Sequence, residues 1–271
     1  MIYKIYPLLV FLLLSFGKDS NNTPEIKEAT TKSIAKVEKF TVEAKIESVY
    51  HMLNSNNFNL PGLKTFSEAL KGFYLLKEKG VIQKDILTVI DFSLSSNTKR
   101  LWVIDLTTNT ILFNSLVAHG RNTGEEFASN FSNSNSSFKS SLGFYATGEI
   151  YQGKHGASLR LDGLENGINS NARQRGVVMH GADYVSESFI RDHKRLGRSQ
   201  GCPALPVDLT DEIIELIKNK SCLYIYHPSR SFAMEQRLIS EFSIQIRIKI
   251  INISSENELI FFAPGCPVPL V

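Results

Sequence analysis

Two kinds of hydrophobic pattern divide the chain. Between about residues 42 and 79 the apolar residues recur every three or four positions, which is typical of amphipathic helices. From residue 86 to residue 226 they form short runs bounded by turn-forming residues, which is typical of strands. Strict alternation of apolar and polar residues from Phe242 to Ile250 predicts one more strand. The chain is therefore expected to be helical near its start and mainly β afterwards.

Two helices are expected in the first part. The second runs from about residue 65 to residue 79, where Thr65 and Glu68 fit a capping box and Gly80 ends the helix. Its apolar stripe is expected to pack against the following sheet. The apolar positions are Val42, Ile46, Val49 and Leu53 in the first helix and Leu63, Phe66, Leu70, Phe73 and Leu76 in the second.

The β part contains several further predicted features. Strands are expected at residues 86–92, 101–106, 111–118, 158–161, 177–179 and 222–226, with a hairpin turn at 107–110. Residues 125–141, rich in Ser, Asn and Phe, are expected to form a long loop on the substrate side. Residues 151–156 and 162–175 are also predicted to be turn and loop. A short helix over residues 211–218 would be capped by Asp208 or Thr210.

Residues 1–17 are predicted to be a secretory signal peptide. Lys4 supplies positive charge, Ile5 to Phe16 is apolar, and Ser15 and Gly17 are small residues at the positions that a signal peptidase reads. The alternative is an uncleaved membrane anchor. If the signal is cleaved, the mature protein is expected to have no stable membrane span, and it would be exported to the periplasm or cell envelope.

Composition excludes some classes of protein. The 271 residues carry a net charge of only +3, and no basic stripe with interleaved aromatics indicates nucleic-acid binding. Of three cysteines, Cys222 is expected in the core, and a disulfide between it and Cys266 would need an oxidising compartment. No clustered Cys and His spacing predicts zinc. Trp102, the single tryptophan, is expected in the core.

The segment from Met179 to Pro206 carries the candidate chemistry. His180 follows an apolar run, and Cys202 ends the sequence Ser199-Gln200-Gly201-Cys202. A thiolate attacks carbonyl carbons, and an imidazole accepts and returns the proton. A nearby imidazolium would lower the pKa of the thiol, and backbone amides around Gly201 and Cys202 would stabilise the oxyanion. The two side chains meet only if the segment between them folds back.

This segment resembles the active-site signature of the L,D-transpeptidases of bacterial cell walls, the YkuD-like family. That signature is His-Gly, a spacer, and then Ser/Thr-His-Gly-Cys followed by Arg or Asn. Here His180-Gly181 matches the first part, while Gln200 replaces the second His and Pro203 replaces the Arg or Asn. The sequence R-S-x-G-C-P-A at residues 198–204 resembles a divergent murein L,D-transpeptidase branch.

The resemblance implies a mainly β catalytic domain with flanking helices, similar to the L,D-transpeptidase β-sandwich. It divides the chain into the signal (1–17), a polar linker and helical region (18–62), the catalytic domain (63–230) and a C-terminal β extension (231–271) with no assigned role. The implied enzyme is a monomer that needs no cofactor or metal. Its substrates would be the stem peptides of peptidoglycan.

The implied activity is cleavage of a tetrapeptide stem after its third residue and transfer of the acyl group to a stem amine, giving a 3→3 crosslink. Two alternatives remain open: an L,D-carboxypeptidase in which water resolves the thioester, and a non-catalytic wall-binding module. A thiol redox protein is disfavoured, because no resolving cysteine lies near Cys202 in the sequence.

Site residues are assigned on the same basis. Cys202 would be the nucleophile and His180 the base, with Nδ1 held by a backbone carbonyl such as that of Gly181. Support or oxyanion contacts would come from Gly201, Ser199, Gly181, Gln200 and Tyr151. Arg198 would bind a stem carboxylate.

The Arg and His residues considered next are expected to have structural or solvent-exposed positions and no direct role in the chemistry. Arg173, Arg175 and Arg191 are expected on solvated faces. His119 and His155 are expected to be structural, with a place in the cleft as the alternative for each. His193 is expected in a solvated loop, His227 at the boundary after a strand, and His51 in the N-terminal helical part.

Overall fold

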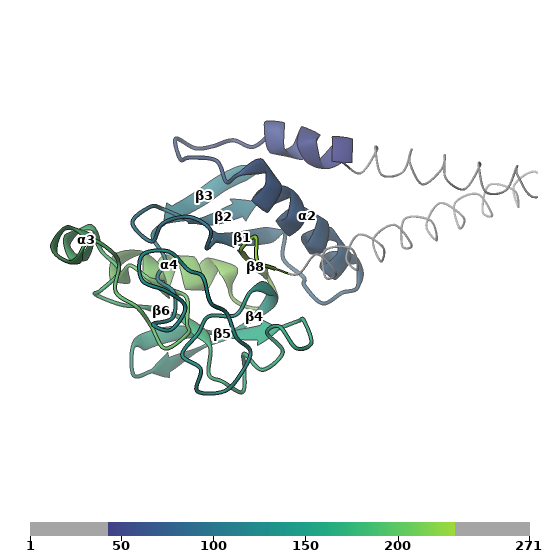
Figure 1. The fold of residues 1–271 in the computed structure, drawn as a ribbon. Coiled ribbons are helices and arrows are strands. Elements are labelled where there is room, and N and C mark those ends of the chain that lie inside the picture. Colours follow the sequence, from purple (N-terminus) through teal and green to yellow (C-terminus); the bar gives the residue numbers. More distant parts are fainter. Residues whose placement is uncertain (1–42, 231–271) are drawn as a thin grey trace, which may run out of the picture. The chain divides into compact units, whose positions relative to one another are not determined.

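The computed structural model describes residues 43–230, so the segments predicted at 1–17 and 231–271, and the strand predicted at 242–250, lie outside the described residues. Residues 43–51 are helical. The other elements are α2 (Leu63–Glu78), β1 (Ile86–Asp91), β2 (Leu101–Asp105), β3 (Thr110–Ser115), β4 (Gly143–Gly153), β5 (Gly156–Gly163), β6 (Val178–Gly181), α3 (Glu187–His193), β7 (Ala204–Leu205), α4 (Val207–Ile217) and β8 (Cys222–Tyr226) (Figure 1).

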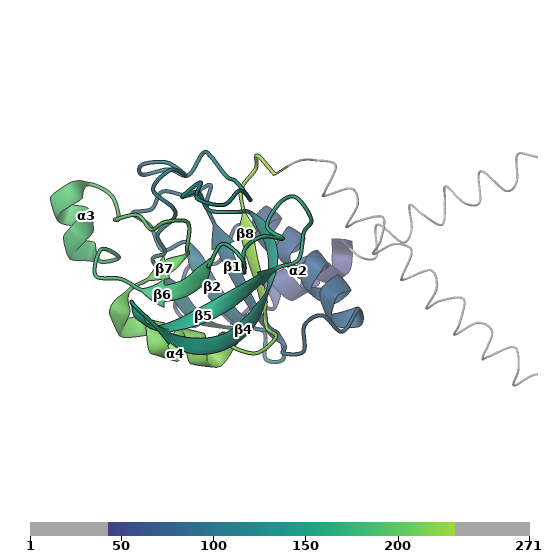
Figure 2. The same ribbon diagram turned by 90° about the horizontal axis from the view of Figure 1, so that it is seen from below.

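The strands form one sheet in the order β3-β2-β1-β8-β4-β5-β6-β7. Neighbouring strands are antiparallel except for the pairs β1–β8 and β6–β7, which are parallel. β4 and β5 form a long, strongly bent hairpin (Figure 2). The expectation of a mainly β domain with flanking helices is confirmed.

The sheet separates two hydrophobic cores, and β8 shows how the sequence divides between them. Leu223 and Ile225 enter the first core, whereas Cys222, Tyr224 and Tyr226 enter the second, because side chains alternate along a strand. The first core also takes residues from both β2 and β5, so the two halves of the sheet enclose it in a sandwich-like arrangement. α4 closes this core against β4, β5 and β6.

α2 and the helical segment 43–51 cover the second core, as their apolar spacing predicts. Gly80 ends α2 with a positive φ of 69°, but Leu63 is 40% exposed and does not belong to the buried stripe. The predicted capping box is wrong: α2 begins after Gly62, and the buried Thr65 hydroxyl instead donates to Asp91 Oδ2 at 2.7 Å.

Three other local predictions need correction. α4 begins after Pro206 and has no side-chain cap; Thr210 lies inside it and donates to the Pro206 carbonyl at 2.7 Å. Tyr151 lies in β4 rather than in a turn, because the hairpin turn is confined to the two residues between Gly153 and Gly156. His193 lies in α3 rather than in a loop, although it is exposed as expected.

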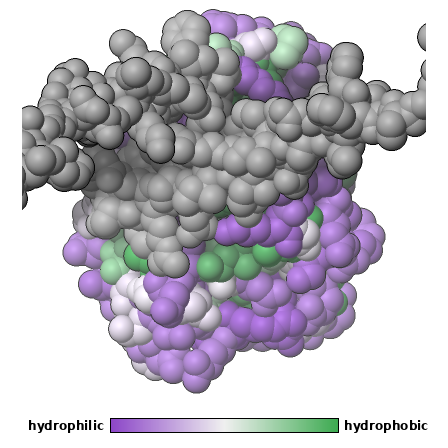
Figure 3. Space-filling model, turned by 90° about the vertical axis from the view of Figure 1, so that its right-hand side faces the viewer, coloured by the Kyte–Doolittle hydropathy of each residue, from purple (hydrophilic) through white to green (hydrophobic). Residues whose placement is uncertain are grey.

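The coloured part of the face that Figure 3 shows is mostly hydrophilic, with smaller hydrophobic patches. Between residues 43 and 230, no helix combines the length and the apolar composition that crossing a bilayer requires. α3 projects beside the β6–β7 end of the sheet (Figure 2), and none of its residues is buried.

Candidate active site

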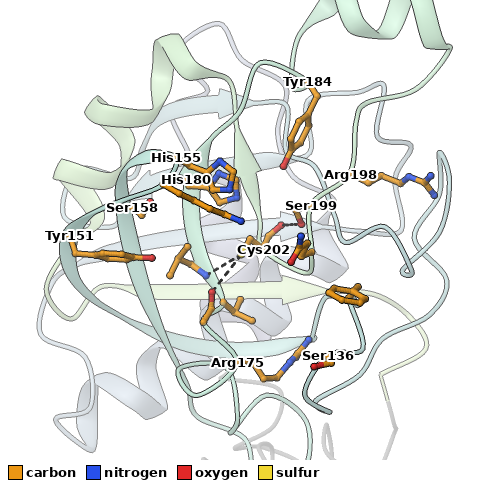
Figure 4. Close-up of a pocket in the computed structure, with 16 residues that line it drawn as sticks. Ser136, Tyr151, His155, Ser158, Arg175, His180, Tyr184, Arg198, Ser199 and Cys202 are labelled. Atoms are coloured by element: carbon orange, nitrogen blue, oxygen red, sulfur yellow. Dashed lines mark hydrogen bonds between the residues drawn. The ribbon is translucent and has the colours of Figure 1, made fainter.

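A cavity of about 430 Å³ opens beside β6 and the turn that precedes β7. It contains both Cys202 and His180, so the segment between them does fold back as their chemistry requires (Figure 4). The other lining residues are Ser136, Phe138, Tyr151, Lys154, His155, Ser158, Arg175, Gly176, Val177, Val178, Tyr184, Arg198, Ser199 and Gln200.

Strand pairing places the thiol. His180 on β6 is in register with Ala204 on β7 in a parallel pair, so Cys202, two residues earlier, lies beside Val178. The Val178 N–H donates to Cys202 Sγ at 3.5 Å, and the thiol donates to the Gly176 carbonyl at 3.8 Å (Figure 4). The backbone before His180 thus positions the sulfur at the floor of the cavity.

The His180 imidazole is held on two sides. Its Nδ1–H donates to the Gly181 carbonyl at 2.9 Å, which leaves Nε2 as the ring atom able to accept a proton. The His155 ring stacks on it, with centroids 4.4 Å apart and planes at 17° (Figure 4). Among the described residues the hydrogen bonds of the thiol go to backbone groups and not to this imidazole.

Burial favours the neutral form of both groups. Burial raises the pKa of Cys202, although the Val178 N–H and the cations of Arg175 and Lys154 partly offset that effect. Burial, together with His155 and Lys154, lowers the pKa of His180, against the opposing effect of its bond to the Gly181 carbonyl. The expected thiolate–imidazolium pair is therefore not favoured at rest, since burial penalises both charges.

The turn before the nucleophile is fixed by Ser199. Its hydroxyl donates to the Cys202 carbonyl at 2.6 Å and accepts from the Gly201 N–H at 3.0 Å. The expectation that the Gly201 amide faces an oxyanion is wrong, because Ser199 already occupies that N–H. Gly201 is needed for its backbone: φ is +124°, and a Cβ there would lie 2.8 Å from the Lys139 carbonyl oxygen.

Three further polar side chains line the cavity that contains the thiol. Tyr151 lines the cavity, with Arg160 over its ring at 4.3 Å, and Gln200 is an exposed lining residue. Tyr184, which no sequence motif marks, points its hydroxyl into the cavity (Figure 4). Burial and the Cys202 charge raise the pKa of Tyr184 to about 12, so it remains a proton donor. Its position between β6 and α3 gave no sequence signal.

The arginines differ from their expected roles. Arg198 lines the cavity, but its Nη1 is paired with Glu125 at 2.6 Å and also donates to two carbonyls. Arg175, which was expected on a solvated face, lines the cavity and binds the loop at 125–141. Arg173 is exposed and paired with two carboxylates, and Arg191 is exposed on α3, as expected for solvated faces.

Arg175 holds the loop through four hydrogen bonds. Nη1 donates to the Ser132 carbonyl at 2.8 Å and to Ser141 Oγ at 2.6 Å. Nη2 donates to Ser137 Oγ at 3.2 Å and to the Lys139 carbonyl at 2.6 Å. Arg175 thereby fixes the part of the loop that forms one wall of the cavity.

The remaining histidines lie outside the cavity. His119 is buried against Arg100 Nη2 at 2.8 Å, which confirms its structural role, and desolvation and Arg100 lower its pKa to about 4. His227 follows β8 and contacts Phe131 and Ser229, as expected of a boundary residue. His51 is exposed in the first helical segment.

Cysteine and metal chemistry beyond Cys202 is limited in the described part. Cys222 is a fully buried free thiol in β8, as expected for a core residue, whereas Cys266 lies outside the described residues. Within residues 43–230, no group of three or more His, Cys, Asp or Glu side chains is placed to hold a metal ion.

Comparison with known proteins assigns the chain to a protein family. A family model of the L,D-transpeptidase catalytic domain matches residues 60–226, more than half of the chain. No curated protein sequence matches.

Similar solved structures include three bacterial proteins. The chain spans less than two thirds of the length of each of them. They are an L,D-transpeptidase from Mycobacterium smegmatis (13% identity, 53% of this chain and 59% of that chain, TM-score 0.34), an L,D-transpeptidase from Enterococcus faecium (10%, 53% and 50%, 0.33) and Bd1075 from Bdellovibrio bacteriovorus (12%, 60% and 56%, 0.36).

Proposed function

Because the chain belongs to the L,D-transpeptidase catalytic domain family, we propose that it is a peptidoglycan L,D-transpeptidase with Cys202 as nucleophile and His180 as general base. One observation carries this proposal: thiol and imidazole line one cavity, and the Gly181 carbonyl fixes the imidazole tautomer that accepts a proton at Nε2. Peptidoglycan lies outside the cytoplasmic membrane, so the proposal requires export.

The first half-reaction cleaves the donor stem. Nε2 of His180 takes the thiol proton as Sγ attacks the carbonyl carbon of the third stem residue. Because burial favours the neutral form of both groups, this proton moves during the attack rather than before it. The Cys202 amide, which interacts with its own sulfur, and the Tyr184 hydroxyl, which lines the same cavity, would stabilise the resulting oxyanion. His180 then protonates the departing nitrogen, the C–N bond breaks, and a thioester with free D-Ala remains.

The second half-reaction resolves the thioester. An amine of another stem attacks the thioester carbonyl, His180 accepts a proton from its nitrogen, and the C–S bond breaks. The proton returns to the sulfur, which regenerates the thiol. The product is the 3→3 crosslink.

Hydrolysis is the second candidate outcome, and the charge of the cavity favours it. The described lining contains Lys154, Arg175 and Arg198 but no Asp or Glu. An acceptor that arrives as an ammonium ion therefore meets no counter-ion there, whereas water is not penalised. In that case the enzyme is an L,D-carboxypeptidase.

Product analysis tests the proposal. The full chain, Cys202→Ala and His180→Gln are incubated with a disaccharide-tetrapeptide, and the products are separated by liquid chromatography with mass detection. Crosslinked dimer plus D-Ala from the wild type alone supports the transpeptidase. Tripeptide plus D-Ala without dimer supports the carboxypeptidase, and equal turnover by Cys202→Ala would refute both. Unchanged binding of the disaccharide-tetrapeptide without turnover by folded wild type would favour a wall-binding module.

A further inference from the structure

Three cations line the cavity, and two of them are already occupied. Arg198 is paired with Glu125, and the Nη hydrogens of Arg175 are bound to the loop that forms the cavity wall. Lys154 differs from both, because it is exposed and forms no ion pair or hydrogen bond within residues 43–230. It is thus the cation of the lining that remains able to bind a ligand.

The hairpin fixes where Lys154 lies. Gly153 and Gly156 form the last pair of the β4–β5 ladder, so Lys154 and His155 make up the turn. His155 stacks on the catalytic His180, which holds the turn at the mouth of the cavity (Figure 4). The Lys154 ammonium lowers the pKa of both Cys202 and His180, which shows that its charge reaches both reacting groups.

We propose that Lys154 is a specificity residue that binds the carboxylate of the leaving residue of the donor stem. The inference rests on the proposed function, because it takes the scissile bond to be at Cys202. In a tetrapeptide donor the leaving residue ends in a carboxylate, whose carbon lies on the order of 4 Å from the scissile carbonyl carbon, about one residue spacing. A carboxylate bound there is therefore within reach of a flexible lysine whose charge already reaches the thiol.

This role predicts that the enzyme selects stems by the charge of their last residue. A donor with a free terminal carboxylate gains a charge-assisted hydrogen bond from Lys154, which at a partly exposed site is worth about tenfold in kcat/KM. A donor whose terminal carboxylate is converted to an amide keeps the same scissile bond but offers Lys154 no negative charge. Longer stems, which place the carboxylate one residue farther away, should be used poorly for the same reason.

The test compares two donors that differ only in that charge. Full-length wild type, Lys154→Met, Lys154→Arg and the control Lys99→Met, whose lysine is exposed and outside the cavity lining, are assayed with tetrapeptide stems ending in D-Ala or in D-alaninamide. The readout is the ratio of kcat/KM for the acid to that for the amide. This ratio cancels any effect of Lys154 on the thiol pKa, which acts equally on both donors.

The wild type, Lys154→Arg and Lys99→Met should prefer the acid about tenfold, and Lys154→Met should lose that preference. Equal use of acid and amide by the wild type, or an unchanged ratio in Lys154→Met, would overturn the role of Lys154 while leaving the proposed function intact. If neither donor acylates wild-type Cys202, the proposed function itself fails, and this inference with it.

Discussion

Arg175 connects the loop over the cavity to the nucleophile, and its substitution separates two effects. Its guanidinium makes four hydrogen bonds to the loop, and its charge lowers the pKa of Cys202. Lysine keeps the charge but, with a single nitrogen, cannot span all four acceptors. Methionine keeps neither. Arg175→Lys therefore isolates the hydrogen bonds, and Arg175→Met adds the loss of charge.

The structure sets the size of the stability effect. Hydrogen bonds from a charged donor contribute up to about 3 kcal/mol when buried, but Arg175 is only half-buried, so we take about 0.5–1 kcal/mol for each. The four bonds then stabilise the fold by about 2–4 kcal/mol. For a domain of this size, 1 kcal/mol shifts the Tm by about 2–4 °C. Arg175→Met, which loses all four bonds, should therefore melt roughly 5–15 °C below the wild type, and Arg175→Lys, which can keep some of them, should show a smaller decrease.

The thiol titration reports the charge effect. The rate of Cys202 alkylation by iodoacetamide, measured on the peptide that contains Cys202, follows the thiolate fraction, and the buried Cys222 does not compete. The midpoint in pH should move upward in Arg175→Met and stay near that of the wild type in Arg175→Lys. Arg173→Met, which removes an exposed arginine paired with Glu149 and Asp162, should change neither quantity much. A wild-type Tm in Arg175→Met, or equal midpoint shifts in the Lys and Met variants, would refute the reasoning.

Three further predictions concern the residues around the site. Buried His119 has a pKa of about 4, so between pH 6.5 and 4 it takes up a proton only when the protein unfolds. Acidification over this range should therefore lower the free energy of unfolding, measured by urea titration, by about 3 kcal/mol. His119→Gln should remove this pH dependence, and an equal pH dependence in variant and wild type would contradict the prediction. His155→Phe keeps the ring stack on His180 and should lose about twofold in kcat, whereas His155→Ala should lose about tenfold. The acid limb of the pH–rate profile should move to higher pH in both variants, because His155 lowers the pKa of His180. Equal losses of kcat in the two variants would count against a role for the stack. Gly201→Ala should lower the free energy of unfolding by about 1–3 kcal/mol, measured by thermal melts. Gly167→Ala should cost less, because Gly167 also has a positive φ but an added Cβ there would meet open space. A wild-type Tm for Gly201→Ala would be inconsistent with the backbone conformation at Gly201.

Elements with a clear apolar period were predictable from the sequence. α2 was placed within two residues of its observed limits because its buried side chains repeat at helical spacing. β8 was placed at its observed limits because it is a short apolar run, and all five of its residues are buried. α3 was missed because none of its residues is buried, so no stripe marks it. The end of β4 was predicted as a turn because its last residues are only partly buried or exposed, and Tyr151 among them lines the cavity.

Some residues of the candidate site were predictable from the sequence, and others were not. Cys202 and His180 were selected from residue type and neighbouring motif, and strand pairing brings them to one cavity. Arg175, Tyr184 and His155 reach that cavity from loops and a hairpin turn, so only the three-dimensional arrangement shows their roles. The protonation states depend on burial, which the sequence does not specify at these positions.

The central claim is that Cys202 forms a thioester with the donor stem, and intact-protein mass spectrometry tests it most directly. The full chain is mixed with a disaccharide-tetrapeptide, quenched early in acid and mapped by peptide digestion. We predict an added mass equal to the donor minus D-Ala, located on Cys202, absent from Cys202→Ala and absent from the buried Cys222. Turnover of the stem with no adduct at Cys202, or an adduct that persists in Cys202→Ala, would contradict the account.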